Sequence, residues 1–436
     1  MYRSASERDL TVSLATDTDV EGEDGRVANE VIILTHMLGR FLDDFGNVVR
    51  YLERDGARVT IYTSPPVDTP NFSTDSPEHV AEYRRRLPPS IRIEALPYVR
   101  GGKMMPWEVL RMMVLGFRLA RRHPDAMFMM WSVYVIIACG LPLRLFGRRI
   151  LCMVTGLGPV LGSSGRRFRA MRTIILTVYR FLMSGRNSRC LNHNASDKRF
   201  LARTLRADPA KFFVTPGCGV DPELFPFFEE RPSNPRPIVV VPARLIVEKG
   251  IREAVAASGI LRDRGVDHEM WFTGATEPYP WISVTEVERE RAERENPSVR
   301  FIGFQESMVP IYRQVDIVCL PTRYPEGTPT VLIEAAATGR VGVTCETVGA
   351  VEIVLDGETG LVVPQRDPSA LADALQTLMI DPDRYERYRR SAYQHFLRHY
   401  TKDMALRATL AAFESTGMTF RVERSAPDFR VDERTS

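Results

Sequence analysis

Val31-Ile-Ile-Leu-Thr35 is a continuous apolar run of the kind that forms a parallel strand buried on both faces. The next residues, as far as Leu52, have a helical pattern, and Gly56 then leads into a second strand, Arg58-Val-Thr-Ile-Tyr62. Strand, helix and strand in this order form a β–α–β unit, which builds a parallel sheet. The ordered part of the chain therefore opens as an α/β domain.

The same alternation continues on both sides of a proline-rich segment. Before that segment we expect a helix at Glu108–Arg122 and further strands at Ile91–Leu96, Ala126–Trp131 and Ile150–Val154. After it we expect strands at Ile238–Val241, Met270–Thr273, Val299–Ile302, Ile317–Leu320, Gly342–Thr344 and Leu361–Val363. This order predicts an α/β fold with two doubly wound parallel sheets, in Rossmann-like domains that face a cleft. Such sheets bind ligands at the carboxyl ends of their strands, so the cleft is the expected site.

The domain boundaries follow from these patterns. Residues 1–28 are polar and acidic with little apolar periodicity, which predicts a disordered tail. The prolines of 221–237 interrupt the alternation and indicate a linker. We expect Rossmann-like domains at 29–220 and 238–390, helices at 391–417 that pack back on the N-terminal domain, and a tail at 418–436.

Length and composition exclude several classes of protein. At 436 residues, with 44% apolar and 26% charged residues, the chain suits a soluble protein with two cores and is unlike a disulfide scaffold. Its six cysteines are scattered without a C-x-x-C pair, which indicates reduced thiols. Gly140 and Pro142 interrupt the apolar stretch Ala126–Leu143, so we interpret it as a buried strand running into a helix, not as a membrane span. The acidic N-terminus is unlike a secretory signal and favours a cytoplasmic protein.

Charge is distributed unevenly along the chain. Residues 1–100 carry 12 Lys and Arg against 17 Asp and Glu, residues 101–200 carry 17 against 3, and the remainder carries 29 against 35. The net charges of these parts are therefore −5, +14 and −6, within a total of +3. A cationic segment of this strength favours an anionic partner, either lipid headgroups or nucleic acid.

Part of this charge gathers on one predicted helix. Its basic face, about one third of the circumference, consists of Arg166, Arg169, Arg172 and Arg180. Its opposite, apolar face consists of Met171, Ile175, Val178 and Leu182. The basic face suits an anionic membrane surface, where each basic residue contributes about 1 kcal/mol. The alternative is an ordinary amphipathic helix with a solvated basic face. A second charged feature, Asp43-Asp44, is expected on a solvated helix face.

The sharpest motif runs from Tyr324 to Gly339, YPEGTPTVLIEAAATG. Thr328 is suited to cap a helix that starts at Pro329 and stops at Gly339. The amides of residues 327–330 would then be available to a diphosphate. Glu326 precedes this helix and Glu334 lies eight residues later, so that two carboxylates bracket a sugar nucleotide, one at the sugar and the other at the ribose.

This motif resembles the E-x7-E element of family-4 retaining glycosyltransferases of the GT-B fold. Pro242-Ala-Arg-Leu-Ile-Val-Glu-Lys-Gly250 resembles the strand-to-helix turn of that family. The resemblance implies that the catalytic residues, which bind the donor diphosphate and sugar, are Arg244, Lys249 and Glu326. It implies that the other donor-binding residues are Gly327, Thr328, Pro329, Thr330 and Glu334.

The N-terminal half resembles the glycosyltransferases that extend saccharides on polyprenyl diphosphates. The similar segments are Val154-Thr-Gly-Leu-Gly158, Asn194-Ala-Ser-Asp197 and Gly217-Cys-Gly-Val-Asp221. The resemblance implies that this domain binds the acceptor and that Thr155, Gly156 and Gly158 line the cleft. Relatives often carry His where this chain has Thr155, so we name no catalytic base. The family is usually pictured with front-face attack, in which the leaving phosphate helps to deprotonate the acceptor.

The function expected from these features is sugar transfer with retention of configuration, from a UDP- or GDP-sugar to a lipid-linked saccharide. The enzyme would act in polysaccharide or glycolipid synthesis, peripherally at the inner leaflet of the membrane and without nucleic acid. We expect no cofactor and no metal, because Arg244, Lys249 and helix amides already neutralise phosphate; Asp17-Thr-Asp19, a D-x-D match, lies in the tail. Three alternatives stay open: transfer to a soluble acceptor such as a sugar phosphate, a GT-B epimerase, and a non-catalytic module that binds an anionic surface or nucleic acid.

Overall fold

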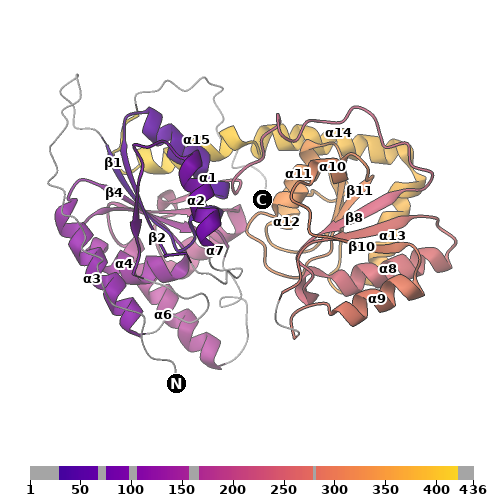
Figure 1. Cartoon of the computed structure of the whole chain (residues 1–436), viewed down its shortest axis with the longest axis horizontal. Helices are drawn as coiled ribbons and strands as arrows, with labels where there is room; N and C mark the ends of the chain where they lie inside the picture. Colours follow the sequence, from indigo (N-terminus) through magenta and orange to yellow (C-terminus); the bar gives the residue numbers. More distant parts are fainter. Residues whose placement is uncertain (1–28, 67–74, 98–105, 157–165, 278–280, 421–436) are drawn as a thin grey trace.

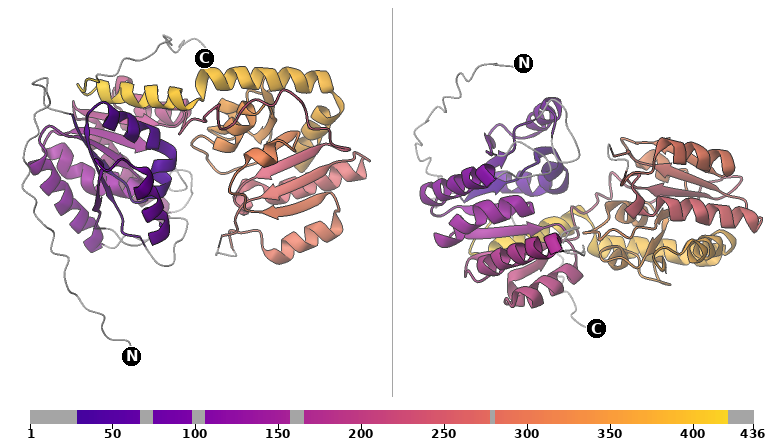
Figure 2. Two further views of the ribbon diagram at one scale, coloured as in Figure 1. Left: turned by 45° about the horizontal axis from the view of Figure 1, so that its top comes forward. Right: turned by 90° about the horizontal axis from the view of Figure 1, so that it is seen from below.

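The chain folds into two α/β domains that lie side by side (Figures 1 and 2). The computed structural model describes residues 29–66, 75–97, 106–156, 166–277 and 281–420. Each domain is a parallel sheet between two layers of helices, which confirms the predicted fold class.

The N-terminal sheet has seven parallel strands in the order β3-β2-β1-β4-β5-β6-β7. The strands are β1 (Glu30–Leu34), β2 (Arg58–Thr63), β3 (Arg92–Ala95), β4 (Met127–Trp131), β5 (Arg149–Val154), β6 (Ser188–Asn192) and β7 (Phe212–Val214). One face packs on α3 (Pro106–Arg122), α4 (Val133–Leu145), α6 (Arg166–Met183) and α7 (Ala195–Leu205). The other face packs on α1 (Leu38–Arg54), α2 (Pro77–Arg86) and α15 (Lys402–Glu414). The order reverses between β1 and β4, so the carboxyl ends of these strands open onto a crevice.

The C-terminal sheet has six parallel strands in the order β10-β9-β8-β11-β12-β13. The strands are β8 (Ile238–Pro242), β9 (Glu269–Thr273), β10 (Val299–Gly303), β11 (Ile317–Leu320), β12 (Val341–Cys345) and β13 (Gly360–Val363). One face packs on α8 (Ile251–Asp263) and α13 (Pro368–Ile380), and the other on α11 (Thr330–Ala337) and α12 (Ala350–Ile353). Short segments complete the domain: η2 (Val247–Lys249), α9 (Glu286–Glu295) and α10 (Val309–Tyr312).

Burial on both faces explains why the central strands contain almost no polar residue. All five side chains of β4, Met-Phe-Met-Met-Trp, are buried, and so are all five of β8. Burying one such side chain contributes about 1.5–3 kcal/mol, and a polar substitution at these positions would lose that contribution. The stretch 126–143 is accordingly strand β4 followed by α4, as we interpreted it. None of the helices in the described ranges is long and apolar enough to cross a membrane.

The final helices divide between the two domains. Helix α14 (Pro382–His399) packs on α11 and α13 of the C-terminal domain, so the predicted boundary at residue 390 falls inside this helix. Only α15 crosses back, where it packs on α1, β6 and β7 (Figure 1). The chain passes between the domains twice, near Val220 and near Thr401, and a β-bridge joins these two residues.

Most predicted strands are present within a residue or two of their expected bounds, but β6 and β7 had not been predicted. Strand β6, Ser-Arg-Cys-Leu-Asn, has only two apolar residues and ends in Asn192, while β7 has only three residues. Neither segment carries the long apolar run that identifies a buried strand.

Candidate active site

Lys249 and Glu326 form the centre of the site. Lys249 ends the turn η2 after β8, and Glu326 lies in the loop between β11 and α11. Lys249 Nζ donates to Glu326 Oε1 at 2.5 Å, and Thr322 Oγ1 donates to the same oxygen at 3.0 Å. Both side chains of the ion pair are about nine-tenths buried, at 13% and 11% exposure. A pair so shielded from water is held in one geometry, which positions the cation beside the loop that leads into α11.

Two glycines allow the backbone to bring these residues together. Gly250 has a positive φ of 74°, and a Cβ there would lie 2.0 Å from the carbonyl oxygen of Pro321. A Cβ on Gly327 would lie 2.1 Å from the carbonyl oxygen of Thr155 in the N-terminal domain. Any larger residue would push these segments apart. Gly250 therefore seats the Lys249 turn against the β11–α11 loop, and Gly327 seats that loop against the N-terminal domain.

Arg244 and Tyr324 extend the site beside Lys249. Arg244 Nη1 donates to Glu277 Oε1 at 2.8 Å. The Lys249 ammonium lies 5.7 Å from the centre of the Tyr324 ring. Burial raises the pKa of Tyr324, the charge of Arg244 opposes that rise, and the charge of Glu326 adds to it. The predicted residues Arg244, Lys249 and Glu326 thus all lie near the Tyr324 side chain.

Glu334 lies inside α11 and is held by a tyrosine. Tyr312 of α10 donates its hydroxyl to Glu334 Oε2 at 2.7 Å. Burial raises the pKa of Glu334, and this hydrogen bond opposes the rise. Tyr312 carries no signal in the sequence motif. It is recognisable only once α10 and α11 are seen packed together.

The predicted cap of α11 was wrong. The helix begins at Thr330 with Pro329 at the N-cap position, and no side chain caps it. The Thr328 hydroxyl donates instead to the backbone oxygen of His193 at 2.7 Å. Asn194 Nδ2 donates to the carbonyl oxygen of Gly327 at 2.8 Å. The hydroxyl that was expected to cap the helix ties it to the N-terminal domain.

The predicted cleft residues of the N-terminal domain lie on the opposite side of this junction. Thr155 and Gly156 follow β5, and their backbone faces Gly327. Gly158 lies outside the described residues. On α6, Arg169 and Arg180 are exposed and Arg172 is partly exposed, whereas the side chain of Arg166 lies outside the described part. The expected apolar face of α6 is only partly buried, because Met171 is 43% exposed.

Buried polar atoms gather where the N-terminal strands end. Within the described ranges, the side-chain atoms without a hydrogen-bond partner include His36 Nδ1, Trp131 Nε1, Ser132 Oγ, Asn192 Nδ2 and Oδ1, and His193 Nε2. They follow the carboxyl ends of β1, β4 and β6. Burial lowers the pKa of His36 to about 4; burial first, and then Arg40, lower that of His193 to about 3. Both imidazoles are therefore neutral at pH 7, with nitrogen atoms available to a polar ligand.

A cavity of about 280 Å³ lies between the domains and includes Glu334 in its wall. The residues that sequence reasoning missed here are Arg40, Cys218, Phe225 and Lys402. Asp44 also lines this cavity and pairs with Arg40 at 3.4 Å, and burial raises its pKa. The expectation of a solvated Asp43-Asp44 face is confirmed for Asp43, which is exposed and accepts a hydrogen bond from Tyr83 at 2.6 Å, and is wrong for Asp44, which faces the cavity.

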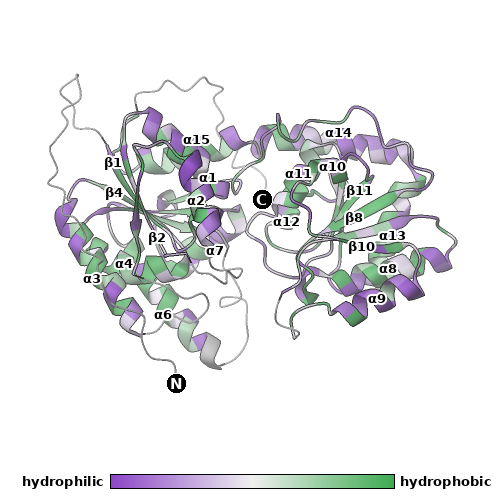
Figure 3. Ribbon diagram, in the orientation of Figure 1, coloured by the Kyte–Doolittle hydropathy of each residue, from purple (hydrophilic) through white to green (hydrophobic). Residues whose placement is uncertain are grey.

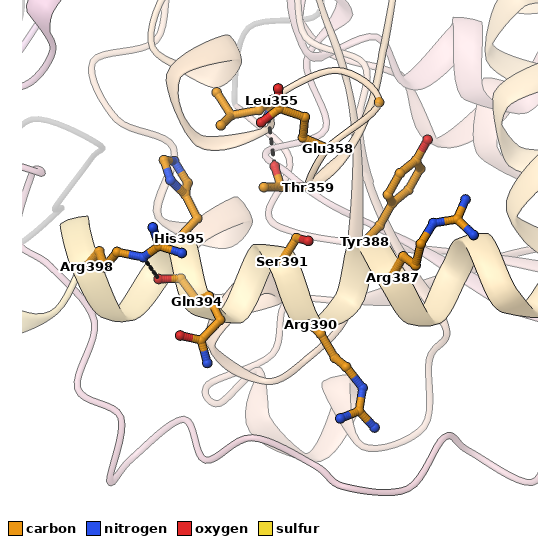
Figure 4. A pocket seen from close by; sticks show the side chains of 11 residues that line it. Leu355, Glu358, Thr359, Arg387, Tyr388, Arg390, Ser391, Gln394, His395 and Arg398 are labelled. Atoms are coloured by element: carbon orange, nitrogen blue, oxygen red, sulfur yellow. Dashed lines mark hydrogen bonds between the residues drawn. The ribbon is translucent and has the colours of Figure 1, made fainter. Parts of the chain in front are cut away.

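A larger hollow of about 540 Å³ lies away from this chemistry, between α14 and the loop before β13 (Figure 4). Its arginines do not converge. Arg398 donates to the backbone of Gln394, Arg390 pairs with Glu386, and Figure 4 shows the Arg387 and Arg390 side chains pointing in different directions. We therefore assign the active site to the cleft.

Glu352 fastens the domains beside the cleft. Its carboxylate accepts hydrogen bonds from the amides of Ala195 and Ser196 and from Ser196 Oγ, at 2.8–3.0 Å. These donors form the first turn of α7, where a negative charge is favoured by the helix dipole. His395 and Tyr400 contact the backbone oxygen of Glu352 at 3.1 and 2.6 Å. The side-chain carboxylate of Glu352, from the C-terminal domain, thus accepts hydrogen bonds from the first turn of α7 in the N-terminal domain.

Part of the chain is similar to known proteins. Residues 236–381 match the family described as "Glycosyl transferases group 1". Glycogen synthase of Mycobacterium tuberculosis is 28% identical over 197 residues, which is 45% of this chain and 46% of the relative. The N,N'-diacetylbacillosaminyl-diphospho-undecaprenol alpha-1,3-N-acetylgalactosaminyltransferase of Campylobacter jejuni is 24% identical over 240 residues, 52% of this chain and 61% of the relative. The chain thus spans roughly half the length of the curated relatives it matches.

The likeness in three dimensions extends over both domains. The crystal structure of Anabaena HepE in complex with UDP superposes with a TM-score of 0.65 at 14% identity, over 88% of this chain and 100% of that one. At this identity the superposition shows the fold alone. The Arg244–Lys249 turn and the Glu326–Glu334 element both fall inside the matched family segment. Residues 236–381 are therefore similar to the glycosyl transferases group 1 family, and the two domains together have the GT-B fold.

Proposed function

We propose that this chain transfers a sugar from a nucleotide diphosphate to a saccharide acceptor with retention of configuration. The observation that carries the proposal is the Lys249–Glu326 pair at 2.5 Å, on the loop that leads to Glu334 in α11. Lys249 and Arg244 supply positive charge for a departing diphosphate, and Glu326 and Glu334 supply acceptors for hydroxyl groups. UDP is the favoured nucleotide, because the Anabaena neighbour was crystallised with it.

In the proposed step, the bond between the anomeric carbon and the phosphate oxygen breaks, and its electron pair stays on the diphosphate. The acceptor hydroxyl forms the new bond on the same face, and its proton passes to the leaving phosphate. Catalysis then consists of positioning and of charge stabilisation, so no metal or cofactor is required. Buried polar atoms at the ends of β1, β4 and β6 suit the hydroxyl groups of the acceptor.

We propose a lipid-linked saccharide as the acceptor, at the cytoplasmic face of a membrane. The Campylobacter relative is named for a diphospho-undecaprenol substrate. The surplus of 17 cations over 3 acids in residues 101–200 suits an anionic leaflet. A soluble acceptor is the competing proposal, and comparing turnover of lipid-linked and free saccharides decides between them.

The first experiment is calorimetric titration of UDP-, GDP- and ADP-sugars in the presence of EDTA. We expect one nucleotide series to bind the wild type, and binding to be lost in Lys249→Met and Glu334→Gln. The control Glu358→Gln removes an exposed carboxylate of the same domain and should bind normally. Folded wild type that binds none of these sugars, even when a divalent metal is restored, would contradict the transferase proposal. An inverted linkage in the NMR spectrum of the product would contradict retention alone.

A further inference from the structure

The N-terminal domain exposes an unusual number of large apolar side chains on one face. Among the described residues, eighteen large apolar side chains are strongly exposed, and ten of these belong to α3, α4 or the residue that follows it, and α6. These helices cover the same face of the sheet, and green, apolar stretches run along all three in Figure 3. Single exposed apolar residues are ordinary, but a cluster of this size marks an interaction surface.

Helix α3 carries the most regular part of this cluster. Trp107, Leu110, Val114 and Phe117 recur at intervals of three and four residues and therefore form one stripe along the helix. Trp107 is 54% exposed and Leu110 is 62% exposed. The opposite side of α3 is buried, through Met112, Gly116 and Leu119. Helix α3 thus has one apolar face inside the protein and a second one outside.

The stripe is held rigidly and cannot fold inward. A Cβ on Gly116 would lie 2.8 Å from the ring of Pro142 and 3.0 Å from the backbone oxygen of Cys139. Helices α3 and α4 are therefore in close backbone contact. The inward face of α3 is already occupied by this packing, and the stripe stays exposed among the residues that the structure describes.

The cluster continues from α3 to α6. Phe117 meets Phe146 edge to face at 6.1 Å, and the Arg144 guanidinium lies 5.3 Å from the centre of the Phe181 ring. Met171 and Ile174 are exposed on α6. We call the following set the apolar band: Trp107, Leu110, Val114, Phe117, Leu145, Phe146, Met171, Ile174 and Phe181.

Positive charge accompanies the band. Exposed arginines on the same helices are Arg111, Arg118, Arg121, Arg122, Arg169 and Arg180. Residues 101–200 contain only three acids, of which Glu108 and Asp197 are buried. An apolar stripe with Trp, Leu and Phe beside arginines is the pattern of a helix lying in the interface of an anionic bilayer. An anionic bilayer offers both complements of this pattern, a negatively charged headgroup layer and an apolar interior.

We propose that the apolar band docks on an anionic lipid bilayer, with the α3 stripe inserted among the headgroups. This inference deepens the proposed function, on which the membrane partner rests, because it assigns insertion chiefly to the α3 stripe, with exposed apolar residues of α6 and of the end of α4 beside it. In a parallel α/β sheet each helix starts beside the carboxyl end of the preceding strand. Trp107 and Leu110 on α3, and Met171 and Ile174 on α6, therefore lie at the cleft end of the domain, where a lipid-linked acceptor would be presented.

The test is cosedimentation of the full chain with phosphatidylcholine vesicles that contain or lack phosphatidylglycerol. We expect wild type to bind the anionic vesicles and Trp107→Ser/Leu110→Ser to bind them about tenfold more weakly or worse, because two large apolar side chains no longer insert. Arg118→Gln/Arg122→Gln should weaken binding mainly at low salt. The control Val287→Ser/Ile380→Ser removes equally exposed apolar residues from the C-terminal domain and should bind like wild type.

Several outcomes would overturn the inference. They are wild type that stays in the supernatant, a Trp107→Ser/Leu110→Ser variant that binds like wild type, and self-association of wild type through the band without vesicle binding. Donor titration of the same variants separates this inference from the proposed function. Vesicle binding without any donor binding would reject the transferase and keep the docking surface. Donor binding without vesicle binding would reject the docking surface and keep the transferase.

Discussion

The two domains differ in how far their positive charges are paired with carboxylates. In the C-terminal domain the cations near the cleft are matched by carboxylates: Lys249 with Glu326, Arg244 with Glu277 and Arg323 with Glu253. In residues 101–200 of the N-terminal domain, seventeen cations face only three acids. Arg144 and Arg148 there lie over the aromatic rings of Phe181 and Phe146. Paired charges fix a geometry, whereas surplus charge attracts an external partner. This difference supports the two proposals, which place the chemistry in the C-terminal domain and the attachment in the N-terminal domain.

The largest effect is expected when the central cation of the site, Lys249, is removed. Lys249→Met should lower the rate of sugar transfer by about 100- to 1,000-fold, because of the two cations proposed to stabilise the departing diphosphate only Arg244 would remain. The measurement is kcat/KM for the donor, because Lys249→Met is also expected to lose donor binding. Lys198→Met, a change of the same type on α7, should leave the rate within about twofold of wild type. Equal losses in both variants would mean that Lys249 acts through general charge and not through its position.

A change at the junction tests whether the two domains must be in register. Gly327→Ala would place a methyl group 2.1 Å from the backbone oxygen of Thr155, so the loop must withdraw from the N-terminal domain. We expect transfer to fall about a hundredfold, as for a misplacement near 1 Å, while the donor still binds the C-terminal domain. Gly259→Ala is the control: a Cβ there meets nothing within 4 Å, and the helix α8 should gain about 0.5–1 kcal/mol of stability.

Glu352 tests how much the junction contributes to stability. Its carboxylate receives three hydrogen bonds from Ala195 and Ser196. Glu352→Gln keeps the size but removes the charge at the end of α7, and should cost about 1–3 kcal/mol of unfolding free energy. Chemical denaturation measures the loss, and scattering in solution should show the domains further apart. A variant as stable and as compact as wild type would mean that the hydrogen bonds of Glu352 to α7 contribute nothing to stability.

The comparison also explains what the sequence could and could not predict. Buried strands such as Met127–Trp131 are visible as apolar runs, and Glu326 and Glu334 are visible because their spacing is local to one loop and helix. The partners of these carboxylates are not local. Tyr312 reaches Glu334 from another element, and Thr328 bonds to His193 across 135 positions of sequence. Thr328 has the propensity to cap a helix, but packing between the domains directs its hydroxyl to His193 instead.

Solvent exposure was the least predictable property. A helical wheel places Met171 on the apolar face of its helix, opposite the basic residues. The structure buries Ile175 and Leu182 but leaves Met171 and Ile174 outside, because the neighbouring helices cover only part of α6. Periodicity identifies the faces of a helix and does not say which neighbours cover them.

The smallest predicted effect concerns the neutral histidines of the N-terminal domain. Burial holds the pKa of His193 at about 3, below the ordinary value of 6.5, so the folded state resists protonation. Its contribution to stability is full above pH 6.5 and is lost as the pH falls toward 3. Between pH 7.5 and 5.5 we expect a loss of about 1.3 kcal/mol from this residue, partly offset by Asp197, whose pKa burial raises to about 6. Urea denaturation at both pH values should show a smaller difference in His193→Asn than in wild type. An unchanged difference would place the acid sensitivity elsewhere, with His36 as the next residue to replace.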